Sequence, residues 1–169
     1  MTCFAHNPEN KDKPIYKNFK TKETEVVNIV TAAYPDFTWY CDKRVTDGCS
    51  KRRPDLLADF GSHVIIVEID EYQHTDYDTT CEEQRLNELY QDLQFRPIVF
   101  IRFNPDSYIN EAGEKLSSCW NADKNGLLRI NPKKAKEWKE RLSKLLEEVD
   151  FHSKNEPTEI VKIIQLFYN

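Results

Sequence analysis

The sequence has only four glycines in 169 residues, and it contains no glycine-rich loop of the kind that cradles phosphates. It also lacks the G-x-S-x-G turn that presents a nucleophilic serine. No apolar run approaches the roughly 20 residues that a membrane-spanning helix needs, and no apolar secretory segment is found near the N-terminus. These absences argue against a P-loop enzyme, a serine hydrolase and a membrane protein.

The distribution of the cysteines does not suggest a disulfide framework. An odd number of scattered cysteines in a chain of this length is typical of reduced thiols. We therefore expect an intracellular protein, either cytoplasmic or nuclear. The five cysteines are Cys3, Cys41, Cys49, Cys81 and Cys119.

The chain has no excess of positive charge, since its 24 Lys and Arg face 29 Asp and Glu. A net charge of −5 argues against a uniformly basic nucleic-acid binder, but it allows local basic patches and an acidic site that holds a metal ion. A hydrophobic content of 39% is enough for one folded domain. We expect an extended lead-in over residues 1–20 and a single domain over residues 21–169.

The hydrophobic pattern predicts an α/β fold. Three segments with apolar residues at helical spacing alternate with short β-branched or aromatic runs that are typical of strands. A buried strand, a helix and a second buried strand follow one another, and this order implies that the two strands pair in parallel. The stretch 104–131 has no clear periodicity beyond a short strand near 127–130, so we expect an irregular connection. The expected helices are 21–34, 81–93 and about 133–149, and the expected strands are 37–41, 56–60, 64–70, 97–103 and an edge strand at 160–168.

Acidic residues stand at the end of the most apolar strand. Val64–Val67 reads as a strand buried on both faces, and Glu68 and Asp70 follow it at a spacing that places both on one face. A third acid, Asp55, precedes the neighbouring apolar run. Three converging carboxylates repel one another unless a divalent cation lies between them. We therefore expect a metal site here, with Mg²⁺ or Mn²⁺ as the cofactor.

Further motifs accompany these acids, namely Arg53-Pro54-Asp55, Glu68-x-Asp70, Gln73-His74, Arg85 and the strand that ends in Arg102-Phe103-Asn104-Pro105-Asp106. Together they resemble the PD-(D/E)xK nuclease superfamily, and most closely the branch of the very-short-patch repair (VSR-like) endonucleases and the EDxHD homing endonucleases. The resemblance covers about residues 21–108. It implies a restriction-endonuclease-like αβββαβ core, a mixed sheet flanked by helices, and metal-dependent hydrolysis of DNA.

The resemblance implies a role for each residue that matches the family motif. Asp55 and Glu68 would hold the metal, with Asp70 as a third ligand at the position where the superfamily has a lysine. Since an aspartate cannot replace that lysine, His74 becomes the candidate general base. Gln73 and Glu23 would orient water, and the cations that would contact DNA phosphates are Lys51, Arg52, Arg53 and Arg85.

Several alternatives remain open at this point. Glu68 and Asp70 can instead form a buried ion network with Arg52, Arg53 or Arg85, and His74 can simply donate to a backbone carbonyl. The pattern predicts that the lysines at 133, 134, 136 and 139 lie on a solvent-exposed helix face. The chain as a whole can be an inactive nuclease-fold module that binds nucleic acid or protein, or an RNA nuclease. A homodimer or a partner DNA-binding domain would supply the affinity that a short acidic chain lacks.

Overall fold

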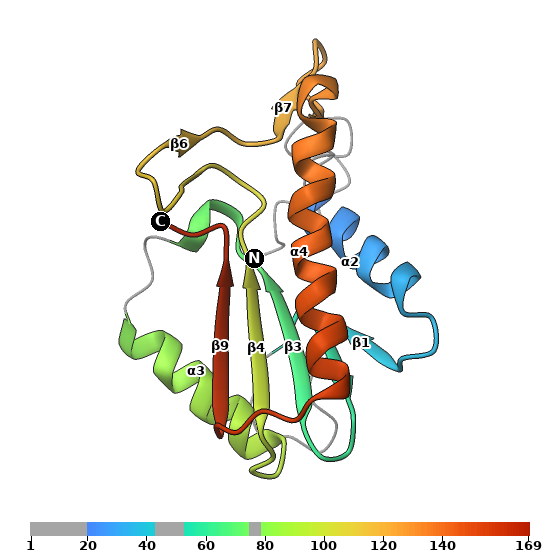
Figure 1. Cartoon of the computed structure of the whole chain (residues 1–169), viewed down its shortest axis with the longest axis vertical. Coiled ribbons are helices and arrows are strands. Elements are labelled where there is room, and N and C mark those ends of the chain that lie inside the picture. Colours follow the sequence, from blue (N-terminus) through green and yellow to red (C-terminus); the bar gives the residue numbers. More distant parts are fainter. Residues whose placement is uncertain (1–19, 43–52, 75–78) are drawn as a thin grey trace, which may run out of the picture.

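The computed structural model describes residues 20–42, 53–74 and 79–169, with only the backbone described for Tyr72, His74 and residues 79–82. These residues form an α/β protein with a five-stranded mixed sheet and three α-helices. Helices α2 and α4 cover one face of the sheet and α3 covers the other (Figure 1). The helices are α2 (Thr21–Ala33), α3 (Thr79–Asp92) and α4 (Ala135–Lys154).

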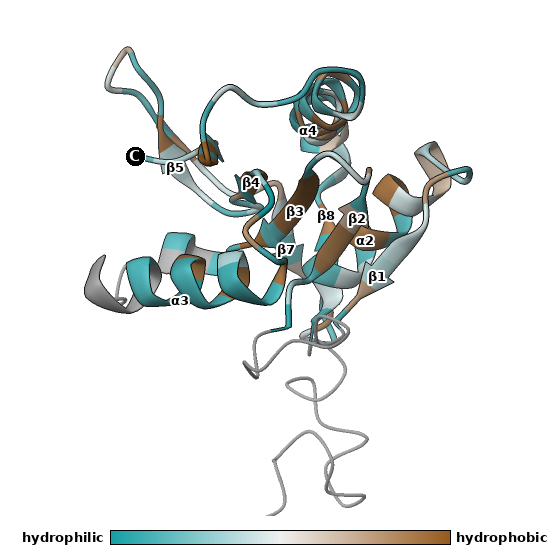
Figure 2. Cartoon of the chain, turned by 90° about the horizontal axis from the view of Figure 1, so that it is seen from below, coloured by the Kyte–Doolittle hydropathy of each residue, from teal (hydrophilic) through white to brown (hydrophobic). Residues whose placement is uncertain are grey.

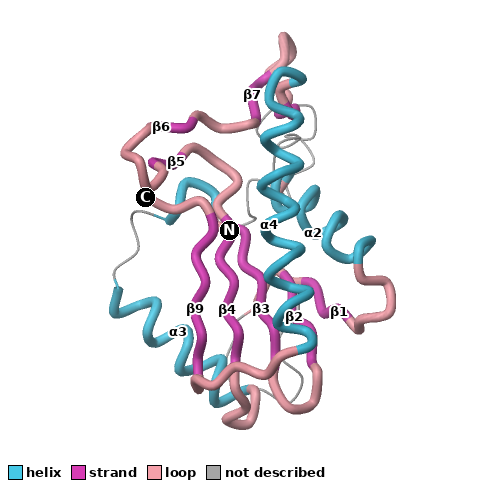
Figure 3. The backbone as a smooth tube through the Cα atoms, in the orientation of Figure 1, coloured by secondary structure: helices cyan, strands magenta, loops and turns pink. Residues whose placement is uncertain are grey.

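The sheet has the strand order β1-β2-β3-β4-β9, and the tube in Figure 3 follows its path. The first three strands form an antiparallel meander, whereas β3, β4 and β9 run parallel. The expected parallel pairing of the two most apolar strands is thus confirmed, as is an edge strand at the C-terminus. The strands are β1 (Trp39–Cys41), β2 (Leu56–Asp59), β3 (Val64–Ile69), β4 (Ile98–Phe103) and β9 (Val161–Leu166).

Two hydrophobic cores flank the sheet because side chains alternate between its faces. In β3, Ile65 and Val67 face α2 and α4, whereas Val64 and Ile66 face α3. Burial of both faces explains why β3 and β4 are apolar throughout, and Figure 2 shows the hydrophobic colour on these central strands. The polar residues that continue the α3-facing row, beginning with Glu68, therefore need a reason to be there.

The longest helix, α4, buries an apolar stripe against the sheet. The expected positions Trp138, Leu142, Leu145 and Val149 are all buried. The helix begins at Ala135 after a 3-10 turn (Pro132–Lys134) and ends at Lys154, five residues later than expected. No helix among the described residues is apolar and long enough to cross a membrane.

The connection between β4 and α4 is more regular than the sequence suggested. Two small antiparallel hairpins occupy it, β5–β6 (Tyr108–Ile109 with Lys115–Leu116) and β7–β8 (Trp120–Ala122 with Leu128–Ile130). Only β8, near 127–130, was predicted. Strands of two or three residues are too short to produce a readable alternation, so the sequence pattern predicted an irregular segment.

Candidate active site at the end of the central strands

Asp55 and Glu68 are neighbours in the structure. Asp55 immediately precedes β2, and the antiparallel register that pairs Leu56 with Val67 continues to place Asp55 beside Glu68. The Asp55 carboxylate also accepts a hydrogen bond at Oδ2 from the backbone N–H of Ile69, at 2.8 Å. Two acids separated by twelve residues in the chain therefore meet at the same end of the sheet.

Glu68 is a buried carboxylate whose positive partner lies partly in solvent. Its side chain is 6% exposed and forms an ion pair through Oε1 with Arg85 of α3, which is 30% exposed. Burial raises the pKa of Glu68 to about 8; Arg85 opposes this rise, and the negative charges of Asp55 and Asp70 add to it. Water screens the exposed guanidinium, so the pair does not offset the cost of burying the carboxylate.

Asp55 also has a raised pKa, and its surroundings include the helix acid expected at this site. Burial raises the pKa of Asp55 to about 6, the hydrogen bond from Ile69 lowers it, and the negative charge of Glu23 raises it further. Glu23 lies in the first turn of α2, where Lys20 Nζ donates to its Oε1 at 2.8 Å. The structure therefore brings Glu23, Asp55, Glu68 and Arg85 into one electrostatic neighbourhood.

Asp70, by contrast, accepts hydrogen bonds from two other side chains. Arg102 Nε donates to its Oδ2 at 2.5 Å, and the hydroxyl of Tyr168 donates to the same oxygen. Arg102 reaches it from β4, directly beside Glu68 in the parallel register. Within residues 20–42, 53–74 and 79–169, no three His, Cys, Asp or Glu side chains are grouped so that they could hold a metal ion. Asp70 is thus held by a cation from β4 and a hydroxyl near the C-terminus, and its role as a third metal ligand stays a prediction.

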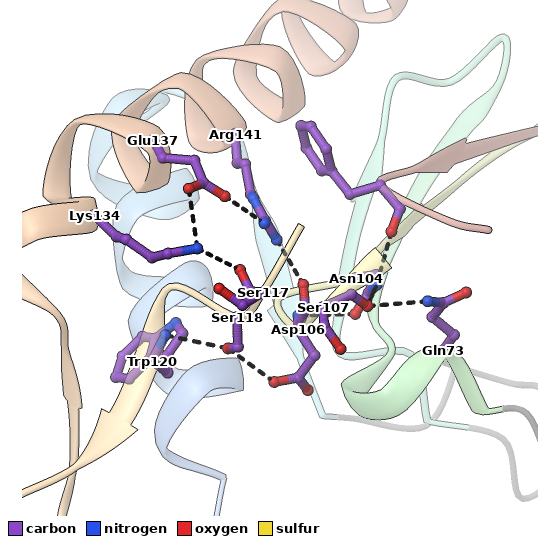
Figure 4. Close-up of polar contacts among 11 residues, drawn as sticks. Gln73, Asn104, Asp106, Ser107, Ser117, Ser118, Trp120, Lys134, Glu137 and Arg141 are labelled. Carbon is purple, nitrogen blue, oxygen red and sulfur yellow. Dashed lines mark hydrogen bonds and ion pairs between the residues drawn. The ribbon is translucent and has the colours of Figure 1, made fainter. Parts of the chain in front are cut away.

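Gln73 is also held by the protein itself. Its Nε2 donates to the carbonyl of Ser107 at 3.1 Å and to Asn169 Oδ1 at 3.0 Å, and the backbone N–H of Asn169 donates to Gln73 Oε1 at 3.0 Å. Figure 4 shows Gln73 turned toward Ser107 and Asn104. In this arrangement Gln73 fastens the C-terminal end of the chain to the loop after β4.

The remaining predicted residues divide into two groups. Arg85 contacts Glu68, whereas Arg53 is exposed to solvent. Lys51, Arg52 and the side chain of His74 lie outside the described residues; the backbone of His74 closes a 3-10 turn (Glu71–His74) directly after Asp70. The ion network proposed as an alternative is present in part, since Arg85 does pair with Glu68.

Sequence reasoning missed a buried polar cluster beside this site. Lys22 of α2 is 2% exposed; its Nζ donates to Asp106 Oδ1 at 2.7 Å and lies 3.5 Å from Glu71 Oε2. Arg141 of α4 is equally buried and donates to the backbone carbonyl of Asp106 at 2.6 Å (Figure 4). Lys22 stands four and eight residues before Val26 and Val30, so it lies on the buried face of α2, and this helical spacing was the signal that could have found it.

Comparisons with protein-family models, with curated proteins and with solved structures find no significant match to this chain.

Proposed function

We propose that the protein is a divalent-metal-dependent endonuclease that hydrolyses phosphodiester bonds of DNA. The observation that carries the proposal is the pair formed by Asp55 and Glu68, which lie side by side and both have raised pKa values. A buried and a half-buried carboxylate with too little positive charge around them favour a cation. Mg²⁺ commonly uses one or two protein carboxylates and completes its shell with water and substrate phosphate, so this pair is sufficient.

The order of the elements supports the same proposal. Helix α2, strands β1 to β3, helix α3 and strand β4 follow one another as α, β, β, β, α, β. This is the order implied by the resemblance to the PD-(D/E)xK nucleases. Asp55 adjoins β2, and Glu68 lies in β3.

The proposed chemistry divides between the metal and the residues around it. A divalent cation held by Asp55 and Glu68 would lower the pKa of a bound water and offset the charge of the phosphate. Glu23, whose charge already raises the pKa of Asp55, would orient water at this pair. Arg85 keeps Glu68 in place, and His74, which follows Asp70 on the 3-10 turn, remains the proposed general base.

Asp70 and Gln73 take positioning roles in this proposal. Because Arg102 and Tyr168 hold the carboxylate of Asp70, it fixes the end of β3 and thereby the orientation of Glu68. Gln73 holds the turn that carries His74 through its bonds to Ser107 and Asn169. The proposed metal site thus uses two carboxylates from the protein.

A plasmid-nicking assay with Mg²⁺ or Mn²⁺ tests the proposal. Asp55→Asn and Glu68→Gln should each lower the rate on the order of a hundredfold or more, because metal stabilisation of the transition state is worth several kcal/mol. Asp59→Asn is the matched control, since Asp59 lies at the other end of β2 and pairs with Arg96. Equal nicking by wild type and both site variants would refute the assignment.

A second candidate function is a nuclease-fold module that binds nucleic acid without cutting it. It is favoured by one observation: Asp70 stands where the superfamily has a lysine, and it is paired with Arg102. Calorimetry with Mg²⁺ in the presence of DNA separates the two functions, because an inactive module would show no metal binding that depends on Glu68. Competition between DNA and RNA substrates tests whether RNA is the substrate instead.

A further inference from the structure

Positive charge is concentrated in one short part of this acidic chain. Residues 120–139, which form the β7–β8 hairpin and the start of α4, contain six Lys and Arg and two Asp and Glu. Their net charge is +4, so the other 149 residues together carry −9. We call this segment the basic arm. Its cations are Lys124, Arg129, Lys133, Lys134, Lys136 and Lys139.

The two acids of the basic arm are engaged in local structure. Asp123 Oδ1 accepts hydrogen bonds from the backbone N–H groups of Asn125 and Leu127 and so builds the hairpin turn. Glu137 Oε1 accepts from Arg141 Nη2 at 2.6 Å. The cations, with the exception of Lys134, are solvent-exposed. The arm therefore presents mainly positive charge to the solvent.

Lys134 lies 3.3 Å from Glu137, but ion pairing within the helix does not account for the exposed lysines. Lys136 Nζ lies 3.7 Å from Glu140 Oε1, but the two side chains are 92% and 65% exposed, so water screens the pair. Lysines near the start of a helix also oppose its dipole, which favours acids at that end. The lysines at 133 and 136 thus contribute little to folding, and both are exposed to solvent.

The basic arm is held in a defined position on the rest of the molecule. Trp120 of β7 packs edge-on against Trp138 of α4, with ring centroids 5.5 Å apart. The backbone N–H of Asn131 donates to the carbonyl of Cys119 at 2.8 Å, and Lys134 Nζ donates to the carbonyl of Ser117 at 2.8 Å. The hairpin and the helix start therefore form one preorganised surface.

The basic arm lies at the same end of the sheet as the candidate active site. In Figure 1, α4 begins and β7 lies beyond the end where β3 and β4 finish. A chain of contacts joins the two regions: Glu71 lies next to Lys22, Lys22 donates to Asp106, and Ser118 Oγ donates to Asp106 at 3.2 Å. Ser118 in turn accepts from the N–H of Trp120, the first residue of β7. Figure 4 shows the part of this chain formed by Asp106, Ser118 and Trp120.

We propose that the basic arm binds the phosphate backbone of the DNA duplex whose cleaved phosphodiester lies at Asp55 and Glu68. This inference rests on the proposed function, to which it adds a second and larger contact surface. A rigid hairpin and a helix start with net positive charge complement a continuous row of phosphates. The acidity of the rest of the chain would then help to confine DNA to this edge of the molecule.

Fluorescence anisotropy with a short labelled DNA duplex tests the inference. Lys133→Gln combined with Lys136→Gln should weaken binding on the order of tenfold, and should reduce the slope of log K against log salt by about 2 between about 50 and 200 mM salt. The matched control is Lys144→Gln combined with Lys154→Gln, which removes the same charge from exposed positions nearer the other end of α4. The control should bind like wild type, and Lys124→Gln should weaken binding severalfold.

Binding by the Lys133/Lys136 variant that equals wild type would overturn the inference, as would equal weakening in the control. Binding of anionic lipid vesicles through the same lysines, without DNA binding, would also overturn it. Glu68→Gln separates the two proposals, because it should bind the duplex normally but fail to nick plasmid. If the wild-type protein binds DNA through the basic arm but never cuts it, the proposed nuclease activity is refuted and the proposed DNA binding by the basic arm is supported.

Discussion

Replacing Glu68 with glutamine should remove a large part of the pH dependence of folding stability. The pKa of Glu68 is raised from 4.5 to about 8 in the folded state, so between these values the folded protein keeps a proton that the unfolded chain releases. Stability therefore falls as pH rises through this window, which is the reverse of the usual behaviour of an ion-paired carboxylate.

The size of this effect follows from the two pKa values. At about pH 6 the Glu68 carboxyl is protonated in the folded state and ionised in the unfolded state. The free energy of unfolding at this pH therefore exceeds that at about pH 9 by the equivalent of roughly two pKa units. At about 1.4 kcal/mol per unit, wild type should lose about 3 kcal/mol of unfolding free energy through Glu68 between pH 6 and pH 9. Glu68→Gln carries a neutral isostere at all these pH values, so this loss should disappear from its profile.

Urea denaturation at a series of pH values measures the difference. Wild type and Glu68→Gln should have unfolding free energies that diverge as pH rises, with the variant more stable at alkaline pH. Glu83→Gln, at an exposed position on the same helix as Arg85, should follow wild type. If the unfolding free energies of wild type and Glu68→Gln run parallel across this pH range, then Arg85 keeps Glu68 ionised. In that case the Asp55 and Glu68 pair does not lack positive charge.

Two further variants test the polar contacts that surround the site. Lys22→Met leaves the Asp106 carboxylate buried without its ammonium partner, so urea denaturation should show a loss of about 3–5 kcal/mol; a loss below 1 kcal/mol would mean that water replaces the amine. Tyr168→Phe removes a hydroxyl that donates to the buried Asp70 and should cost about 1.5–3 kcal/mol, whereas Tyr40→Phe at an exposed position should change stability by less than about 0.5 kcal/mol. Equal effects of the two tyrosine variants would contradict the role given to Tyr168.

The central strands and helices could be predicted from sequence because their signals are local. The β-branched run that begins at Val64 and the apolar row of Leu86, Leu89 and Leu93 each report burial through spacing alone. Of the two hairpins between β4 and α4, only strand β8 was predicted, because two-residue strands such as Tyr108–Ile109 carry no periodicity. The lysines at 133, 134, 136 and 139 were interpreted as a solvated helix face, and only the fold places the start of α4 at the same end of the sheet as the acidic pair.

The sequence by itself determined that Glu68 and Asp70 extend one face of a buried strand and that Asp55 stands at the start of its neighbour, because alternation along a strand is a property of the backbone. Which cation each acid meets was decided only in the tertiary structure. Arg102 and Tyr168 reach Asp70 from positions 32 and 98 residues away, and Lys22 meets Asp106 across 84 residues. Pairing of buried charges depends on which strands and helices pack together, and that packing arises from the whole chain.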